Sequence, residues 1–192
     1  SFSNIQSSIA PMFHSSCQFG DYDKDGFLDI LHTGENQGYS YARVWRNNGL
    51  DPNTRPYKPE NISIRQYTAN SVHLYWDAPD PWDQGISGTE TPKNALTYNI
   101  YVGTEPQFID IMSPHSKTTA DNDNGLNGLR RTVDFGNTSN ALVWEIKDLP
   151  VGGGYKWGVQ SIDNAFAGSE FANGTFIIYE LPDYTDAHPA SV

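Results

Sequence analysis

The chain has 192 residues, a formal net charge of −11 and one cysteine, Cys17. A surface this acidic repels nucleic-acid phosphates and anionic lipid headgroups, so we expect no nucleic-acid partner and no attraction to anionic membranes. A single thiol excludes an intramolecular disulfide and a zinc site built from several cysteines. No apolar run reaches transmembrane length, so we expect no insertion into a membrane.

The first 56 residues predict a small β-structure around an acidic loop. Strands are predicted at 1–6, 15–20, 30–33 and 42–46. A polar turn is predicted over 35–41, and Asn47-Asn48-Gly49 predicts a turn that accepts positive φ. Cys17 lies in an alternating apolar segment, so we expect a buried, unreactive thiol.

Four aspartates stand at positions 1, 3, 5 and 9 of the loop: Asp21, Asp23, Asp25 and Asp29. Acids this close repel one another unless a cation collects them, and Ca²⁺ prefers carboxylate and carbonyl oxygens. Gly26 permits a sharp turn, and Phe27 would add its backbone carbonyl. The sequence therefore predicts a calcium site. The alternative is an acidic turn that stays solvated.

The loop differs from an EF-hand, which needs Glu at position 12 and flanking helices. Position 12 is His32, and both flanks read as strands. Phe19-Gly20, the acidic run 21–26 and the segment 44–49 resemble the FG-GAP (VCBS) repeat of integrin-type β-propellers. This resemblance implies a propeller blade with a calcium loop.

Only one such repeat is visible, whereas a propeller takes about four to eight blades. We therefore expect the blade to pack on upstream blades of a larger parent protein or on the segment that follows it. Residues 51–56 read as a short linker, so 1–56 forms the first predicted domain.

Residues 57–180 predict a second domain, a β-sandwich built from short alternating strands. The predicted strands are 59–64, 71–78, 96–102, 141–149, 155–162 and 171–179. Their alternation places Val72, Leu74 and Trp76 in the core and His73 on the solvent side of the same strand. Trp144 and Trp157 are also predicted to lie in the core. The predicted fold class is all-β throughout.

Several segments resemble a fibronectin type III domain. Leu149-Pro150, the glycines 152–154 and then Tyr155 resemble the turn that leads to the tyrosine corner of that family. Trp76 matches its core tryptophan, and segments 94–104 and 160–171 resemble a fibronectin-type domain that follows FG-GAP repeats in secreted bacterial proteins.

The sequence departs from a plain fibronectin domain at 108–140, a long predicted insertion. Its acidic run 121–125 begins like a calcium loop but has Leu129 where the closing acid would stand. A solvated turn is the preferred interpretation, with a second metal site as the alternative. Residues 181–192 read as a tail or linker.

No motif predicts catalysis, because the five histidines are scattered singly and neither a nucleophile elbow nor a phosphate loop occurs. We therefore predict that the protein is not an enzyme. Trp82 lies in a Pro- and Gly-bearing loop beside acids. The preferred interpretation is that it folds over the sandwich end, and the alternative is that it contacts a glycan or protein ligand.

Open calcium sites of this kind fill at the millimolar concentrations found outside the cytosol. The sequence thus predicts a calcium-stabilised extracellular or cell-surface module, acting in adhesion, recognition or spacing within a larger multidomain chain. The alternative function is a carbohydrate-binding accessory module of a secreted enzyme.

Overall fold

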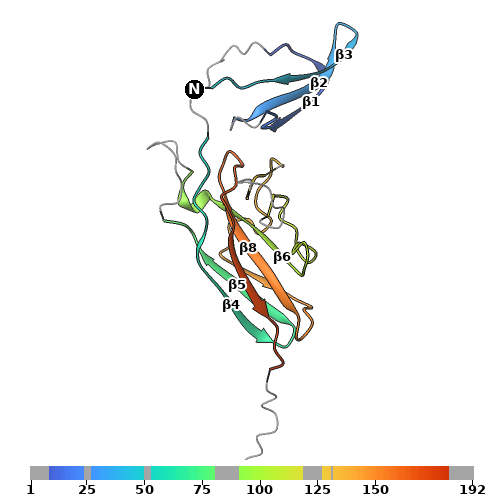
Figure 1. The fold of residues 1–192 in the computed structure, drawn as a ribbon. Coiled ribbons are helices and arrows are strands. Elements are labelled where there is room, and N and C mark those ends of the chain that lie inside the picture. The colour runs from blue at the N-terminus through green and yellow to red at the C-terminus, as the bar shows by residue number, and fades with distance from the viewer. Residues whose placement is uncertain are drawn as a thin grey trace, which may run out of the picture. The chain divides into compact units, whose positions relative to one another are not determined.

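The computed structural model describes residues 9–23, 27–49, 53–80, 91–118, 127–130 and 132–181. The chain separates into two compact units, Ser1–Thr54 and Arg55–Val192 (Figure 1). The described residues are all-β, with strands β1 to β9 and one short 3₁₀ helix, η1 (Lys93–Ala95). The strand predicted at 1–6 and the tail from 182 onward lie outside the described residues.

The first unit contains an antiparallel sheet in the order β1-β2-β3. Its strands are β1 (Phe13–Gly20), β2 (Asp29–Asn36) and β3 (Tyr39–Trp45). Because β2 is the central strand, its residues Ile30 to Thr33 each pair with one residue of β1 and one of β3, whose side chains lie on the same face. The loop between β1 and β2 is the predicted acidic loop.

A two-residue turn, Gln37-Gly38, joins β2 to β3. Both residues have positive φ, 53° and 81°, as a type I′ hairpin turn requires. This tight turn corrects the prediction of a polar turn over 35–41. The strands run on to Asn36 and Tyr39 because the I′ turn matches their twist.

The thiol of Cys17 is exposed, which corrects the prediction of a buried cysteine. Cys17 lies on β1 opposite His32 of the central strand. His32 is the buried member of this pair, with 7% of its surface exposed. Every residue of β1 from Phe13 to Phe19 is exposed, so the alternation of apolar residues along this edge strand did not predict a buried face.

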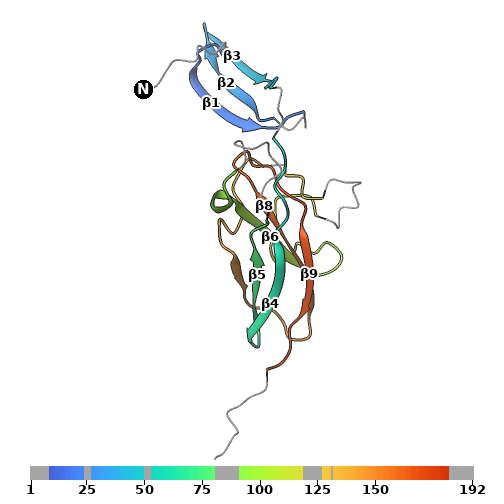
Figure 2. The ribbon, with the colours of Figure 1, turned by 90° about the vertical axis from the view of Figure 1, so that its left-hand side faces the viewer.

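The second unit is a sandwich of two three-stranded antiparallel sheets. One sheet, in the order β4-β5-β7, contains β4 (Glu60–Thr68), β5 (Ser71–Asp77) and β7 (Val143–Ile146). The other, in the order β6-β8-β9, contains β6 (Thr97–Gly103), β8 (Gly154–Ile162) and β9 (Ala172–Ile177). Strands β4 and β9 are in contact along one side of the sandwich (Figure 2).

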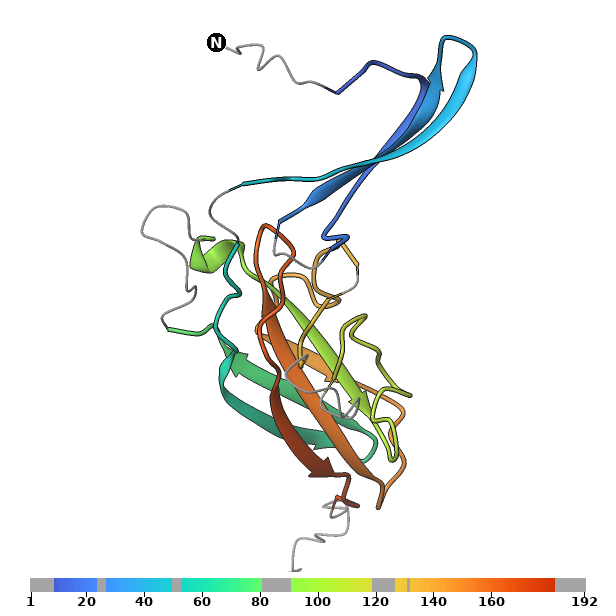
Figure 3. The ribbon, with the colours of Figure 1, turned by 45° about the horizontal axis from the view of Figure 1, so that its top comes forward.

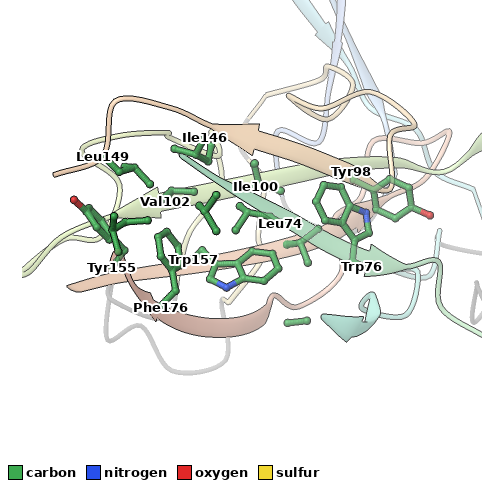
Figure 4. Packing of buried hydrophobic residues seen from close by; sticks show 14 of the residues in the cluster. Leu74, Trp76, Tyr98, Ile100, Val102, Ile146, Leu149, Tyr155, Trp157 and Phe176 are labelled. Atoms are coloured by element: carbon green, nitrogen blue, oxygen red, sulfur yellow. The ribbon is translucent and has the colours of Figure 1, made fainter. Parts of the chain in front are cut away.

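The core lies between the two sheets, where buried side chains of both meet (Figure 4). Trp76 and Trp157 are 2% and 1% exposed, which confirms their predicted core positions. Trp144 is only partly buried and packs against this core. β7 is shorter than the predicted strand 141–149, and Leu142, just before it, is 44% exposed.

The long segment after β6 covers the free edge of that strand (Figure 3). Met112 forms a bridge with Val102. The Asn137 side chain accepts a hydrogen bond from Ile100 N and donates one to Ile100 O, both 2.8 Å. The amide of Tyr98 donates to Ser139 O at 2.7 Å. The predicted insertion thus takes the place of an edge strand, which protects β6 from pairing with another chain.

A tyrosine corner closes the turn before β8, as the sequence predicted. The Tyr155 hydroxyl donates to Pro150 O, five residues upstream, at 3.4 Å. Its ring stacks on Phe176 with ring centroids 5.1 Å apart. Together with the strand orders β4-β5-β7 and β6-β8-β9, this corner makes the second unit a fibronectin type III-like sandwich.

Candidate metal centre

The acidic loop of the first unit begins and ends at one pair of facing residues. Gly20, the last residue of β1, pairs with Asp29, the first residue of β2. The eight-residue connection therefore starts and finishes at the same end of the sheet. This geometry brings Asp21 and Asp23, which directly follow β1, back toward Asp29.

Asp29 is the buried anchor of the loop, with only 1% of its surface exposed. Its Oδ2 accepts a hydrogen bond from Tyr22 N at 3.1 Å, and its Oδ1 accepts one from Asn47 N at 2.8 Å. The carboxylate therefore links the loop after β1 to the turn after β3. Each carboxylate oxygen has a further lone pair that a cation could use.

Three of the predicted ligands come together in the structure. One carboxylate oxygen from each of Asp21, Asp23 and Asp29 lies within 4.8 Å of the others. Calcium–oxygen distances of about 2.3–2.6 Å place ligands on opposite sides of the ion about 5 Å apart, so this spread fits a calcium ion. The donors are hard oxygens, which calcium prefers to nitrogen or sulfur.

A cationic side chain also reaches this cluster. Arg46 Nε lies 2.6 Å from Asp23 Oδ2, and the two side chains are 54% and 25% exposed. Arg46 comes directly after β3, next to Asn47, whose amide binds Asp29. Three carboxylates and one guanidinium leave a net charge of −2 on these described side chains, so the cluster still attracts cations.

The remaining predicted site residues are placed in different ways. Phe27 is half-buried, and its ring lies against Gly49, where an added Cβ would come within 2.6 Å of Phe27 Cε1. Asp25, predicted as a ligand, lies outside the described residues, as do Trp82 and the acidic run 121–125.

Two residues of the centre were not predicted as site residues. Arg46 and Asn47 follow β3, in a segment for which the sequence predicts only a strand and a turn. Asn47 also braces its own turn, because its Oδ1 accepts a hydrogen bond from Gly49 N at 3.1 Å. The Asn-Asn-Gly turn was the available signal, but nothing in it indicated pairing with an acidic loop 18 residues earlier.

The second unit carries an aromatic cluster on the outer face of β4 and β5. His73, predicted to face solvent, is half-buried between Tyr67 and Tyr75. The hydroxyls of these two tyrosines are 3.2 Å apart. Arg65 bonds Tyr67 in turn, and the hydrogen bonds from Tyr75 and Arg65 lower the pKa of Tyr67. These contacts pack the aromatic side chains against one another on the outer surface of the sheet.

Among the described residues, no helix is long and apolar enough to cross a bilayer. No protein-family model matches the chain, and no curated protein matches it.

Solved structures do match. The structure of FN3tt mut is 14% identical, covers 66% of this chain and 100% of its own, and has a TM-score of 0.38. The solution structure of the third fibronectin III domain of human KIAA0343 protein is 16% identical, covers 79% of this chain and 98% of its own, and has a TM-score of 0.40. The twitchin kinase region from C. elegans is 16% identical, with a TM-score of 0.40. That match covers 65% of this chain and 17% of the twitchin chain. These similarities concern the fold alone, and the description of the second unit as fibronectin type III-like rests on its own strand order and tyrosine corner.

Proposed function

We propose that this chain is a non-catalytic, calcium-stabilised module of a larger extracellular or cell-surface protein, where it acts in adhesion, recognition or spacing. The observation that carries the proposal is the convergence of Asp21, Asp23 and Asp29 within 4.8 Å at one end of the β1-β2-β3 sheet. The resemblance of residues 2–49 to an FG-GAP (VCBS) repeat agrees with a calcium loop in this position.

Calcium would act here as a structural ion. Asp21, Asp23 and Asp29 would hold it, with Asp25 and the Phe27 carbonyl as further predicted ligands. The ion would neutralise the carboxylates and fix the β1–β2 loop against the turn after β3. Nothing in this role requires the loop to open, because strands rather than a hinged helix pair flank it.

Thermal unfolding with and without calcium tests the proposal. A site with Kd of about 10⁻⁴ M in about 1 mM calcium contributes roughly 1.4 kcal/mol of stability by linkage. We expect chelation by EGTA to lower the melting temperature, and Asp23→Ala to abolish that sensitivity. Glu35→Gln is the matched control, since it removes an exposed acid of β2 outside the cluster and should keep the calcium response. A melting temperature that EGTA leaves unchanged contradicts the calcium proposal.

The carbohydrate-binding alternative depends on Trp82. Because Trp82 lies outside the described residues, that function stays a prediction from the sequence. Retardation of the chain in polysaccharide affinity gels, lost in Trp82→Ala, would support it.

A further inference from the structure

We propose that Arg46 is a built-in counter-ion that competes with calcium for Asp23 and thereby sets the affinity of the metal centre. This inference rests on the calcium-binding function proposed above. It concerns a residue that does not itself supply a metal ligand. The observation that carries it is the 2.6 Å contact between Arg46 Nε and Asp23 Oδ2.

The position of Arg46 in the fold explains why it reaches the cluster. β3 ends at Trp45, whose partner on β2 is Ile30, the residue after Asp29. Two residues after Trp45, Asn47 N donates a hydrogen bond to Asp29 Oδ1 at 2.8 Å. The backbone on either side of Arg46 is therefore tied to β2 near the acidic loop. The long arginine side chain reaches Asp23 from this position.

The chemistry of the pair predicts competition. The guanidinium occupies Oδ2 of Asp23, one of the oxygens with which that carboxylate could bind a metal. A positive charge held this close also repels a second cation that approaches the same acids. A calcium ion that uses Asp23 must either displace the guanidinium or bind beside it, and both lower the affinity.

The same contact gives the ion-free protein an advantage. Three carboxylates within 4.8 Å repel one another, and one guanidinium offsets part of that repulsion. Arg46 thus holds the loop together when calcium is scarce. The result is a site with a lower calcium affinity, and a smaller dependence of stability on calcium, than the three carboxylates would have without Arg46.

Arg46→Gln tests the inference, because glutamine keeps hydrogen-bonding capacity and removes the charge. Calcium titration of the intact chain by calorimetry should give a Kd about tenfold lower than that of the wild type, equivalent to about 1.4 kcal/mol. In EGTA the variant should melt below the wild type, so its calcium-induced rise in melting temperature should be larger. Raising the salt concentration should shrink the difference in Kd, since the contact is half exposed.

Two matched variants distinguish the effect of the Arg46–Asp23 contact from a general effect of positive charge on calcium binding. Arg46→Lys keeps a positive charge at the site and should bind calcium with a Kd close to that of the wild type. Arg43→Gln removes the same charge from a nearby position on β3, but its guanidinium lies 4.9 Å above the Tyr41 ring. That variant should change the Kd much less than Arg46→Gln does.

The outcomes distinguish the two proposals. If the wild type binds calcium and Arg46→Gln binds it equally or more weakly, the competition by Arg46 is overturned and the calcium function stands. If neither protein binds calcium, both are overturned. If Arg46→Gln does not fold in EGTA, its folding is titrated with calcium by circular dichroism. Folding at calcium concentrations below the wild-type Kd then supports the inference, and folding only above that concentration overturns it.

Discussion

Asn99 of β6 and Gln160 of β8 face each other across the sheet and share a hydrogen bond, Asn99 Nδ2 to Gln160 Oε1, of 2.9 Å. Both side chains project away from the hydrophobic core, yet they are only 2% and 0% exposed. Residues of the segment between β6 and β7 and of the connection between β8 and β9 cover this face. Gln160 Nε2 donates to Gly128 O at 3.0 Å and to Ser169 O at 2.8 Å, and Ser116 Oγ donates to Gln160 Oε1 at 2.6 Å. β6 is therefore buried on both faces along its whole length, and β8 is buried on both faces from Trp157 onward.

Gln160→Leu should destabilise the second unit by about 3 kcal/mol, because it removes one hydrogen-bond acceptor of Asn99 and the side-chain donor to the carbonyls of Gly128 and Ser169. It should also loosen the residues around Ser116 and Gly128 from the sheet, so limited proteolysis should cut near them faster than in the wild type. Chemical denaturation and a proteolysis time course measure the two effects. Gln107→Leu, in an exposed turn of the same region, is the control and should change neither. A Gln160→Leu protein as stable as the wild type would show that this network contributes only packing.

Asp29 and Asp21 should differ in what they do without calcium. Asp29→Ala removes the acceptor of the Tyr22 and Asn47 amides and should cost the first unit about 2 kcal/mol even in EGTA. Asp21 is exposed, so Asp21→Ala should weaken calcium binding with a much smaller effect in EGTA. Amide hydrogen exchange at Asn47 reports the difference: exchange should accelerate in Asp29→Ala alone. Equal acceleration of exchange in both variants would mean that the hydrogen bonds of Asp29 stabilise the turn after β3 no more than the Asp21 carboxylate does.

Leu74→Ala should cost about 2–5 kcal/mol, because Leu74 is fully buried between the sheets and its truncation leaves a cavity. Val143→Ala is the control. Val143 lies on the neighbouring strand β7 but is 41% exposed, so its truncation should cost less than about 1 kcal/mol. Urea denaturation of both variants checks this, and similar losses would contradict the assignment of the core to this face of β5.

Local alternation was enough to predict the inner face of the sandwich. It placed Val72, Leu74 and Trp76 inward, and they are 0%, 0% and 2% exposed. It could not predict that Asn99 and Gln160 are buried, because the partners Ser116 and Gly128 lie 44 and 32 residues before Gln160, in the inserted segment. The sequence showed that a long segment was inserted, but periodicity carries no information on where such a segment packs.

The cluster of Asp21, Asp23 and Asp29 shows the same division. The spacing of Asp21, Asp23 and Asp29 within one loop was sufficient to predict that they converge. Arg46 and Asn47 join them only because β3 pairs with β2 in a particular register. A shift of one residue would turn Arg46 to the other face of the sheet. Contacts that depend on register could not be read from the local sequence pattern.

Tyr98 should make the second unit sensitive to alkali. Burial raises the pKa of Tyr98 to about 12, whereas an unfolded chain releases the phenol proton near pH 10. The folded state is therefore favoured fully below pH 10, and this contribution is lost as the pH rises from 10 through 12. Tyr98→Phe cannot ionise, so its stability should fall less steeply over that window, by up to about 2 kcal/mol. Denaturant midpoints measured from pH 8 to pH 11.5 test this: the midpoints of the wild type and of Tyr98→Phe should run parallel below pH 9 and diverge above pH 10.

Burial also raises the pKa of Tyr155, so part of the loss of stability at alkaline pH should persist in Tyr98→Phe and disappear only in the variant that lacks both tyrosines. Parallel curves up to pH 11.5 would contradict the role assigned to Tyr98.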